Sequence, residues 1–323
     1  MKNFLLSFII IVSGVNAFSQ TIAITGAVKD DQGQHVPLVF IRDAQHFYAT
    51  YADSSGAFRI KADPSSTLIA IAAGYADTKV KIDGKSTINI VMAKGNSSSA
   101  NGASSTAGAT NAGAAAAFSN KEPLVNQSGS STAVKAGFNQ EPTKGSPYLF
   151  ANWVHGFAVG AGDSLLYDIN NLYNYDKTSG DLLYTQDLKR IMQVNKQAIK
   201  YFCLFNGKLY PQIFESAPAV SSKPFTEVLL STSRYKIYKQ TDTKLIRADF
   251  HTDGVIESGH RYDEYDDAVH YYFVRLPGDK PKQISLKKKT LKELMAGDAD
   301  KFISAQGDRD VDEDYVRDLA FSL

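Results

Sequence analysis

The residues that could carry chemistry lie in the second half of the sequence: a serine, an aspartate and a histidine, in the chain order of some hydrolases. Ser164 follows Gly162 and Asp163, and Asp267 precedes His270 by three positions. In nucleophilic catalysis, the histidine would deprotonate the serine hydroxyl while the carboxylate orients the imidazole ring. This chemistry requires the three side chains to meet, so it depends on the elements that carry them.

The run 162–165 (Gly-Asp-Ser-Leu) resembles the nucleophile block of the GDSL hydrolases, and the run 267–270 (Asp-Ala-Val-His) resembles their Asp-x-x-His block. The resemblance implies an α/β fold with helical crossovers, and further blocks that supply an oxyanion glycine and asparagine. The residues after Ser164 instead have the pattern of consecutive strands, and the oxyanion blocks are not evident. We therefore predict no catalytic residues, and keep a serine esterase as an alternative function.

The densest polar cluster, residues 251–270, contains His251, His260 and His270 together with several carboxylates. Histidine nitrogens and carboxylates can ligate a metal ion, but their spacing here matches no known closed site. Charged runs are typical of solvated surface. We predict a loop between two strands, with no metal ligands and no cofactor, although the sequence by itself leaves metal binding by this cluster open.

The chain contains one cysteine, Cys203, which cannot form a disulfide within the chain. It lies in the apolar run 200–204 (Lys-Tyr-Phe-Cys-Leu), which has the pattern of a strand. Free cysteines in such runs behave as small buried apolar residues. We predict a buried, unreactive thiol.

The length and composition of the chain indicate the kind of protein that carries these residues. The chain has 323 residues, which suggests two domains at about 150 residues each. Its 35 basic residues nearly balance its 34 acidic ones, so no overall field attracts nucleic acid or anionic lipid. Tyrosine (17) and phenylalanine (18) are frequent, and aromatic residues favour strands. The sequence therefore predicts a mainly β protein that does not bind nucleic acid.

Residues 1–20 have the pattern of a secretory signal peptide. Lys2 supplies a positive start, and the run 4–12 is an apolar core too short to span a bilayer as a helix. Cleavage after Ala17 or after Ser19 fits the small residues there, and an uncleaved anchor is the alternative. No other stretch has the length and apolar character of a membrane-spanning helix. We expect export to the periplasm, the outer membrane and cell surface, or the medium.

Residues 21–94 form the first predicted domain, in which short strand-like runs alternate with turns. Aspartate opens the turns at 30–33, 53–56 and 83–84, and glycine closes them. About seven short strands with turns this close together predict a seven-stranded antiparallel β-sandwich. The runs are 21–28, 36–41, 47–52, 57–60, 67–72, 79–82 and 87–92.

The motifs of this region also occur in the order of a known family. They are 24–28 (Ile-Thr-Gly-Ala-Val), 31–33 (Asp-Gln-Gly), 36–39 (Val-Pro-Leu-Val), 52–58 (Ala-Asp-Ser-Ser-Gly-Ala-Phe) and 74–75 (Gly-Tyr). With these motifs the region resembles the carboxypeptidase regulatory-like domain. That resemblance implies a transthyretin-like sandwich, common at the N-terminus of exported bacterial envelope proteins, including TonB-dependent receptors.

The resemblance assigns roles to individual residues. It implies that Phe58 and Tyr75 are core aromatics and that Gly56 is a hairpin position. Many members carry glycine after the proline of the second strand, where this chain has Leu38.

The family name does not imply peptidase activity here. A zinc carboxypeptidase needs a His-x-x-Glu motif and a distant third ligand. No histidine of the chain is followed three residues later by glutamate, and the nearest case is His260 with Asp263. The regulatory-like domain is an accessory module, so we predict no peptidase activity.

Residues 95–144 form a predicted linker. The tract 96–119 consists almost wholly of serine, alanine, glycine, asparagine and threonine. Such a tract buries too little apolar surface to offset the entropy lost on ordering. We predict flexible coil.

Residues 145–323 form the second predicted domain, a β-rich α+β domain that ends in short helices. Thr290 with Glu293, and Asp310 with Glu313, have the capping-box spacing of helix starts. The opening run 145–149 (Gly-Ser-Pro-Tyr-Leu) resembles that of a family of uncharacterised exported bacterial proteins. The strand-like runs are 164–169, 181–185, 198–205, 209–214, 225–230, 234–238, 244–250 and 270–276.

These observations favour a non-enzymatic exported cell-envelope protein that acts as an interaction or adaptor module. The expected partner is an envelope protein or polymer. The alternative is a glycan- or small-ligand-binding protein, for which Trp153, Tyr271 and Tyr272 are candidate stacking residues. The ligand, the oligomeric state and the side of the outer membrane are not determined by the sequence.

Overall fold

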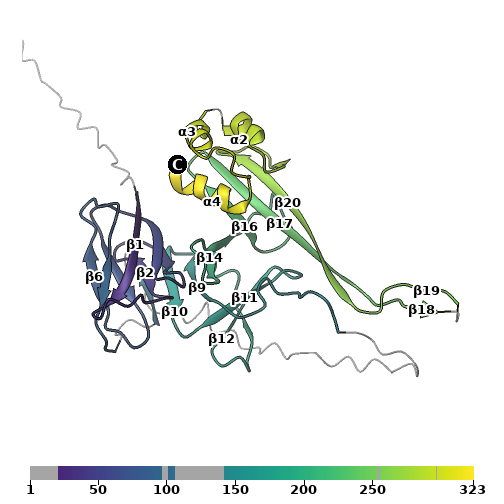
Figure 1. Ribbon diagram of the computed structural model, residues 1–323, viewed down its shortest axis with the longest axis horizontal. Helices are drawn as coiled ribbons and strands as arrows, with labels where there is room; N and C mark the ends of the chain where they lie inside the picture. The colour runs from purple at the N-terminus through teal and green to yellow at the C-terminus, as the bar shows by residue number, and fades with distance from the viewer. Residues whose placement is uncertain (1–20, 97–100, 106–141, 253–254, 296) are drawn as a thin grey trace, which may run out of the picture.

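The structure is a computed structural model (Figure 1) that describes residues 21–96, 101–105, 142–252, 255–295 and 297–323. The predicted signal peptide and most of the predicted linker lie outside these ranges. The described part is mainly β with a few short helices near the C-terminus, as predicted. None of its helices is long and apolar enough to cross a bilayer.

Residues 22–92 form two small sheets, which we call the N-terminal sheet pair. One has the order β4-β1-β7 and the other the order β3-β2-β5-β6. β7 runs parallel to β1, although an antiparallel arrangement was predicted. The chain leaves β6 in one sheet and crosses to the edge of the other, so β7 arrives in the direction of β1. The strands are β1 (Ile22–Asp30), β2 (Phe40–Asp43), β3 (Ala49–Tyr51), β4 (Ala57–Ala62), β5 (Thr67–Ile71), β6 (Thr78–Lys81) and β7 (Ile90–Met92).

The turns of the sheet pair follow from their aspartates and glycines. Asp53 Oδ1 accepts hydrogen bonds from the backbone N–H groups of Ser55 (2.8 Å) and Ala57 (2.9 Å). Gly56 has φ +79°, a backbone conformation that residues with a Cβ atom rarely adopt. Phe58, the next residue but one, is buried in the core between the sheets, and Tyr75 packs against that core half-buried. The predicted core position of Phe58 is confirmed. Gly56 lies in a turn, but the strands on either side of it, β3 and β4, belong to different sheets, so its prediction as a hairpin position was wrong.

Leu38 lies in the left-handed region with φ +56° and is partly exposed. This region costs a residue with a side chain about 1–2 kcal/mol. The glycine found at this position in the family that the region resembles would avoid that cost. Leu38 therefore places backbone strain at the start of the second strand.

A nine-stranded sheet, in which every neighbouring pair is antiparallel, forms most of the rest of the protein (Figure 1). Its order is β21-β20-β17-β16-β15-β14-β9-β10-β8. β14 and β15 are adjacent antiparallel strands joined by the connection 206–211, in which Gly207 has φ +83°. The strands are β8 (Asn101–Ser105), β9 (His155–Gly160), β10 (Ser164–Asp168), β14 (Ile199–Phe205), β15 (Gln212–Glu215), β16 (Thr226–Ser231), β17 (Tyr235–Ile246), β20 (Glu264–Arg275) and β21 (Lys282–Ile284).

β8 comes from the tract that we predicted to be flexible coil. It pairs with β10 from Ser105 opposite Ser164 to Asn101 opposite Asp168. An edge strand such as β10 offers unpaired backbone groups. Backbone hydrogen bonds require no apolar side chains, so small polar residues can fill this edge, and composition alone does not reveal it.

A three-stranded sheet packs against one face of the large sheet through a shared aromatic core. Tyr175 contacts the stacked rings of Phe202 and Phe214, with centroids 6.1 and 4.5 Å away. Tyr175 also donates a hydrogen bond to the carbonyl of Phe225 (2.7 Å). The strands are β11 (Leu172–Asp176), β12 (Asp181–Thr185) and β13 (Met192–Gln193).

Three helices pack on the end of the large sheet near β16, β17 and β20. They are α2 (Lys288–Met295), α3 (Asp300–Ala305) and α4 (Glu313–Ser322). Leu291 and Met295 of α2 are fully buried in the core that the helices share with the sheet. The predicted helix starts were wrong. α2 begins before Thr290 because Leu291 N already bonds Lys287 O (3.0 Å), and α4 is capped by Asp312, which accepts from Tyr315 N (2.7 Å).

The N-terminal sheet pair packs directly on the large sheet through a second aromatic core. Phe40 contacts the rings of Tyr51, Phe157 and Tyr167, and Tyr51 donates a hydrogen bond to the carbonyl of Gly156 (3.2 Å). Because the sheet of β2 and β5 is covered on both faces, consecutive residues of β5 are buried in two different cores. Cys203 is buried in this contact, as predicted.

Candidate functional site

The serine, aspartate and histidine that could form a hydrolase triad are not brought together. Ser164 is on β10, whereas Asp267 and His270 are on β20, six strand-to-strand steps away in the same sheet. At about 4.8 Å per step, this is roughly 29 Å. Asp267 instead accepts hydrogen bonds from Lys177 and Thr243 (both 2.5 Å). The alternative of a serine esterase therefore loses its geometric basis.

The polar cluster 251–270 is divided between a loop and a strand. Residues 264–270 belong to β20, although we predicted a loop there. The prediction failed because this part of the strand is exposed on both faces, so its sequence lacks the alternation of apolar and polar residues that indicates a strand. His251 contacts Ser258 Oγ (2.7 Å), and His260 N donates to Asp249 Oδ1 (2.7 Å). Among the residues that the structure describes, no three histidine, cysteine or acidic side chains are grouped to hold a metal ion.

The most exposed feature of the protein is the outer part of the β17–β20 hairpin, residues 240–270, which we call the hairpin arm. β16 pairs with β17 only as far as Lys239, and β21 pairs with β20 only from Tyr271 onward. Beyond these residues, seven residue pairs, from Gln240–His270 to Ile246–Glu264, continue the ribbon over roughly 20 Å. Figure 1 shows the arm extending away from the body, with β18 (His251–Thr252) and β19 (Glu257–Ser258) at its far end.

The hairpin arm carries a large share of the exposed apolar side chains of the described residues. Four of the eight large hydrophobic residues exposed in the described part belong to it: Ile246, Val255, Ile256 and Val269. Val255 and Ile256, in the far loop, are 90% and 65% exposed. Grouped apolar exposure of this kind is typical of interaction sites.

The base of the hairpin arm is anchored by cations from neighbouring segments. Lys177 forms an ion pair with Asp267 (2.5 Å), and Lys223 donates to the backbone carbonyl of Thr241 (2.5 Å). At the outer end of the ribbon, beyond the pair Ile246–Glu264, Lys144 lies over the ring of Tyr262 at 3.6 Å from its centroid. The arm is therefore held in a defined direction at its base.

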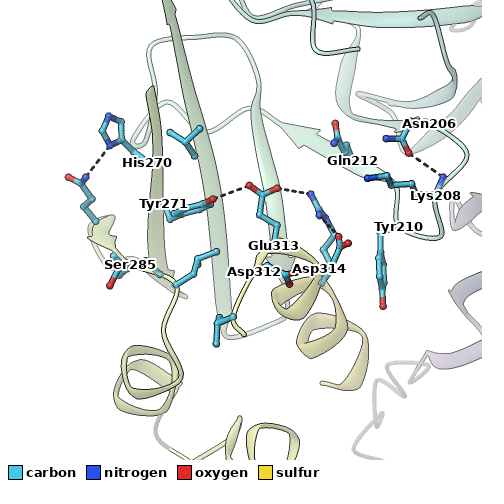
Figure 2. A pocket seen from close by; sticks show the side chains of 16 residues that line it. Asn206, Lys208, Tyr210, Gln212, His270, Tyr271, Ser285, Asp312, Glu313 and Asp314 are labelled. Atoms are coloured by element: carbon cyan, nitrogen blue, oxygen red, sulfur yellow. Dashed lines mark hydrogen bonds and ion pairs between the residues drawn. The ribbon is translucent and has the colours of Figure 1, made fainter. Parts of the chain in front are cut away.

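A polar groove of about 680 Å³ lies between β20, β21, the start of α4 and the β14–β15 connection (Figure 2). Tyr271 and Glu313 occupy its centre, and the tyrosine hydroxyl donates to the carboxylate (2.9 Å). Asn206, Lys208 and Tyr210 form the side of the groove across from β20. Donors and acceptors alternate along the groove, and two aromatic rings lie among them.

A charged network beneath the groove joins α4 to the sheet. Glu227 is buried and pairs with Arg317 (2.6 Å) and Lys239 (3.6 Å), while Glu313 pairs with Lys239 (2.8 Å) and Arg317 (3.4 Å). Burial raises the pKa of Glu227 despite both cations. Burial also acts to raise the pKa of Glu313, but the hydrogen bonds from Lys239 and Tyr271, together with the charges of Lys239 and Arg317, outweigh it and lower the pKa of that carboxyl group. Each of the two buried or half-buried carboxylates, Glu227 and Glu313, is paired with both cations, so the network acts as a structural scaffold.

The end of α4 forms the polar part of the contact with the N-terminal sheet pair. Asp318 accepts hydrogen bonds from Arg59 (2.9 Å), Arg309 (2.7 Å) and the hydroxyl of Tyr210. Burial of Asp318 is outweighed by these three donors, so its pKa is lowered. The guanidinium of Arg59 also stacks on Phe321 at 4.0 Å. This contact fixes how the sheet pair and α4 lie against each other.

The predicted stacking residues do not form a common platform. Trp153 lies near Tyr148, with ring centroids 6.3 Å apart, in a different region from the groove. Tyr271 lines the groove, whereas Tyr272 points to the opposite face of β20 and packs near Val228. We did not predict the network of Glu227, although a carboxylate within the apolar run 225–230 was the available signal.

Comparison with known proteins assigns no family to this arrangement. No protein-family model matches the chain, and no curated protein matches it.

Proposed function

We propose that this chain is an exported, non-enzymatic interaction module of the bacterial cell envelope, and that it engages a protein partner through the hairpin arm. The observation that carries the proposal is the exposed apolar pair Val255 and Ile256 at the end of a ribbon that extends beyond the sheet. The signal-peptide pattern of residues 1–20 supports export. The order of motifs in residues 21–94 supports a carboxypeptidase regulatory-like β-sandwich, an accessory module, in the N-terminal sheet pair.

The physical argument concerns the stability of the arm. A two-stranded ribbon is marginally stable in water unless a third element covers it. The ribbon carries charged residues, among them Asp242, Lys244 and Asp266, which disfavour pairing with another strand along its edges. The loop at its end exposes the apolar side chains of Val255 and Ile256. A partner with an apolar recess would bury Val255 and Ile256 and order the arm at the same time.

Site-specific cross-linking tests this function. A photoreactive benzophenone amino acid is placed at Ile256 in cells that export the full chain, with the same substitution at Val91 as the control. Val91 is 60% exposed on the N-terminal sheet pair, so the two probes are similarly accessible. One discrete cross-linked envelope protein from position 256 alone is expected, and Val255→Ser should weaken it. Equal cross-linking from both positions, or none from position 256, would overturn the proposal.

A second candidate function is binding of a glycan or another small polar ligand in the groove of Figure 2. The supporting observation is the pair of tyrosines, Tyr210 and Tyr271, beside Asn206 and Lys208 in a cavity of about 680 Å³. Cavities of this size hold small ligands. A glycan array followed by calorimetry tests this function, with Lys208→Ala as the groove variant and Lys79→Ala as the control. Binding that is equal in both variants would place the ligand elsewhere.

A further inference from the structure

A second cavity, of about 340 Å³, lies where the N-terminal sheet pair meets the large sheet and α4. We call it the interdomain cleft. Its walls are largely apolar and come from all three parts of the fold, among them Phe157, Cys203, Ile213, Leu229 and Phe321. A cavity of this size and character, at the boundary between packed units, is the usual setting of a small-molecule site.

Two cations of β4 line the interdomain cleft. Lys61 is partly buried, and its Nζ donates to the backbone carbonyl of Ala320 (3.0 Å). No carboxylate of the described residues lies within ion-pair distance of this ammonium group. Burial accordingly lowers the pKa of Lys61, which marks a cation that lacks a compensating charge. Arg59 Nε, next to it in the cleft, is buried without a hydrogen-bond acceptor.

The carboxylates near the interdomain cleft are already engaged by other groups. Glu215 accepts from Lys236 (2.5 Å) and from the hydroxyl of Tyr238 (2.5 Å). Asp318 is shared between Arg59 and Arg309. The cleft therefore retains positive charge at Lys61, beside apolar walls.

We propose that the interdomain cleft binds an amphiphilic monocarboxylate, whose apolar body lies against Phe157, Leu229 and Phe321 while its carboxylate pairs with Lys61. Charge complementarity selects the head group, because a neutral or cationic head would leave the ammonium uncompensated. A ligand in this position would touch the sheet pair, the large sheet and α4 together, and would stabilise their contact.

The volume of the cleft limits the size of the ligand. At about 30 Å³ for each water-sized unit, 340 Å³ holds roughly eleven such units. A straight-chain acid of about ten carbons therefore fits, with its carboxylate at Lys61. Decanoate is a suitable probe, and decanol provides the matched neutral molecule.

Calorimetry on the full mature chain tests the proposal. Decanoate should bind with a stoichiometry of one, at least tenfold more tightly than decanol. Lys61→Gln should remove this preference by weakening decanoate binding at least tenfold, while Lys61→Arg should keep most of it. Lys79→Gln, which removes an exposed lysine of β6, is the control and should bind decanoate like the unaltered chain. Circular dichroism verifies that each variant is folded.

Three results would overturn the proposal. They are no binding of decanoate, equal binding of decanoate and decanol, or decanoate binding that Lys61→Gln leaves unchanged. The test is independent of the hairpin arm, because Val255→Ser should alter cross-linking to a partner without changing decanoate affinity. Failure of either proposal can therefore be recognised separately.

Discussion

Asp318 is the carboxylate through which α4 forms an ion pair with the N-terminal sheet pair. We expect Asp318→Asn to destabilise the protein, because it removes the negative charge that Arg59 (2.9 Å) and Arg309 (2.7 Å) share. The amide oxygen of asparagine can still accept a hydrogen bond, so the charge is lost while the shape of the side chain is kept.

The expected magnitude follows from the degree of burial. Exposed ion pairs contribute up to about 1 kcal/mol, and breaking a fully buried pair costs about 3–5 kcal/mol. The side chain of Asp318 is 20% exposed, between these limits. We therefore expect a loss of about 2 kcal/mol in the free energy of unfolding at pH 7. For a cooperatively unfolding protein of about 200 residues, a loss of this size lowers the midpoint of thermal unfolding by about 4–8 °C.

The lowered pKa of Asp318 also predicts how this loss of stability changes with pH. Because the folded-state pKa of Asp318 is below its ordinary value of 3.8, its charge contributes stability above that value. This contribution is lost as the pH falls through the folded-state pKa. The difference between the unaltered chain and Asp318→Asn should therefore stay constant from about pH 7 to pH 5, and shrink below about pH 4.

Urea unfolding at a series of pH values measures this difference. Asp308→Asn is the control, because Asp308 is an exposed carboxylate in the loop before α4. A free energy of unfolding for Asp318→Asn within about 0.5 kcal/mol of the control at pH 7 would refute the reasoning. So would a difference that grows on acidification.

Three further predictions concern the core, the backbone and export. Phe40→Ala should cost about 3–5 kcal/mol of unfolding free energy in urea, since Phe40 is fully buried between the sheet pair and the large sheet; a cost below about 1 kcal/mol would mean that the two units do not pack this way. Leu188→Asn should raise the unfolding free energy by about 0.5–1 kcal/mol, because Leu188 has φ +58° and is 60% exposed, and asparagine tolerates this conformation; a loss of stability would contradict the strain argument. Mass spectrometry of the exported protein should find an N-terminus directly after Ala17 or Ser19, and an intact Met1 would indicate an uncleaved anchor.

The features that could be predicted from the sequence depend on neighbouring residues. Asp53 and Gly56 form their turn through hydrogen bonds that reach only a few positions along the chain. The short helices near the C-terminus likewise depend on interactions between residues a few positions apart. Such local preferences hold in most tertiary surroundings, so these elements were predicted correctly.

Other features depend on what lies across a sheet face or an edge. Ile69 and Ile71 in β5 are buried because the large sheet covers a face that would otherwise be in water. β8 forms because the edge of β10 accepts its backbone, and residues 264–270 are a strand because β17 is long enough to pair with them. The residue pattern of these segments does not show which sheet or strand will pack against them.

The sequence by itself determined that the protein is mainly β, where its tight turns lie, and that short helices with an apolar face lie near its C-terminus. Only the tertiary structure decided that Glu227, Lys239 and Arg317 share one buried network, and that Arg59 of the sheet pair meets Asp318 of α4. The first set follows from bonds and packing within a few residues. The second follows from strand order and from the docking of two units, which bring together residues separated by as many as 259 positions.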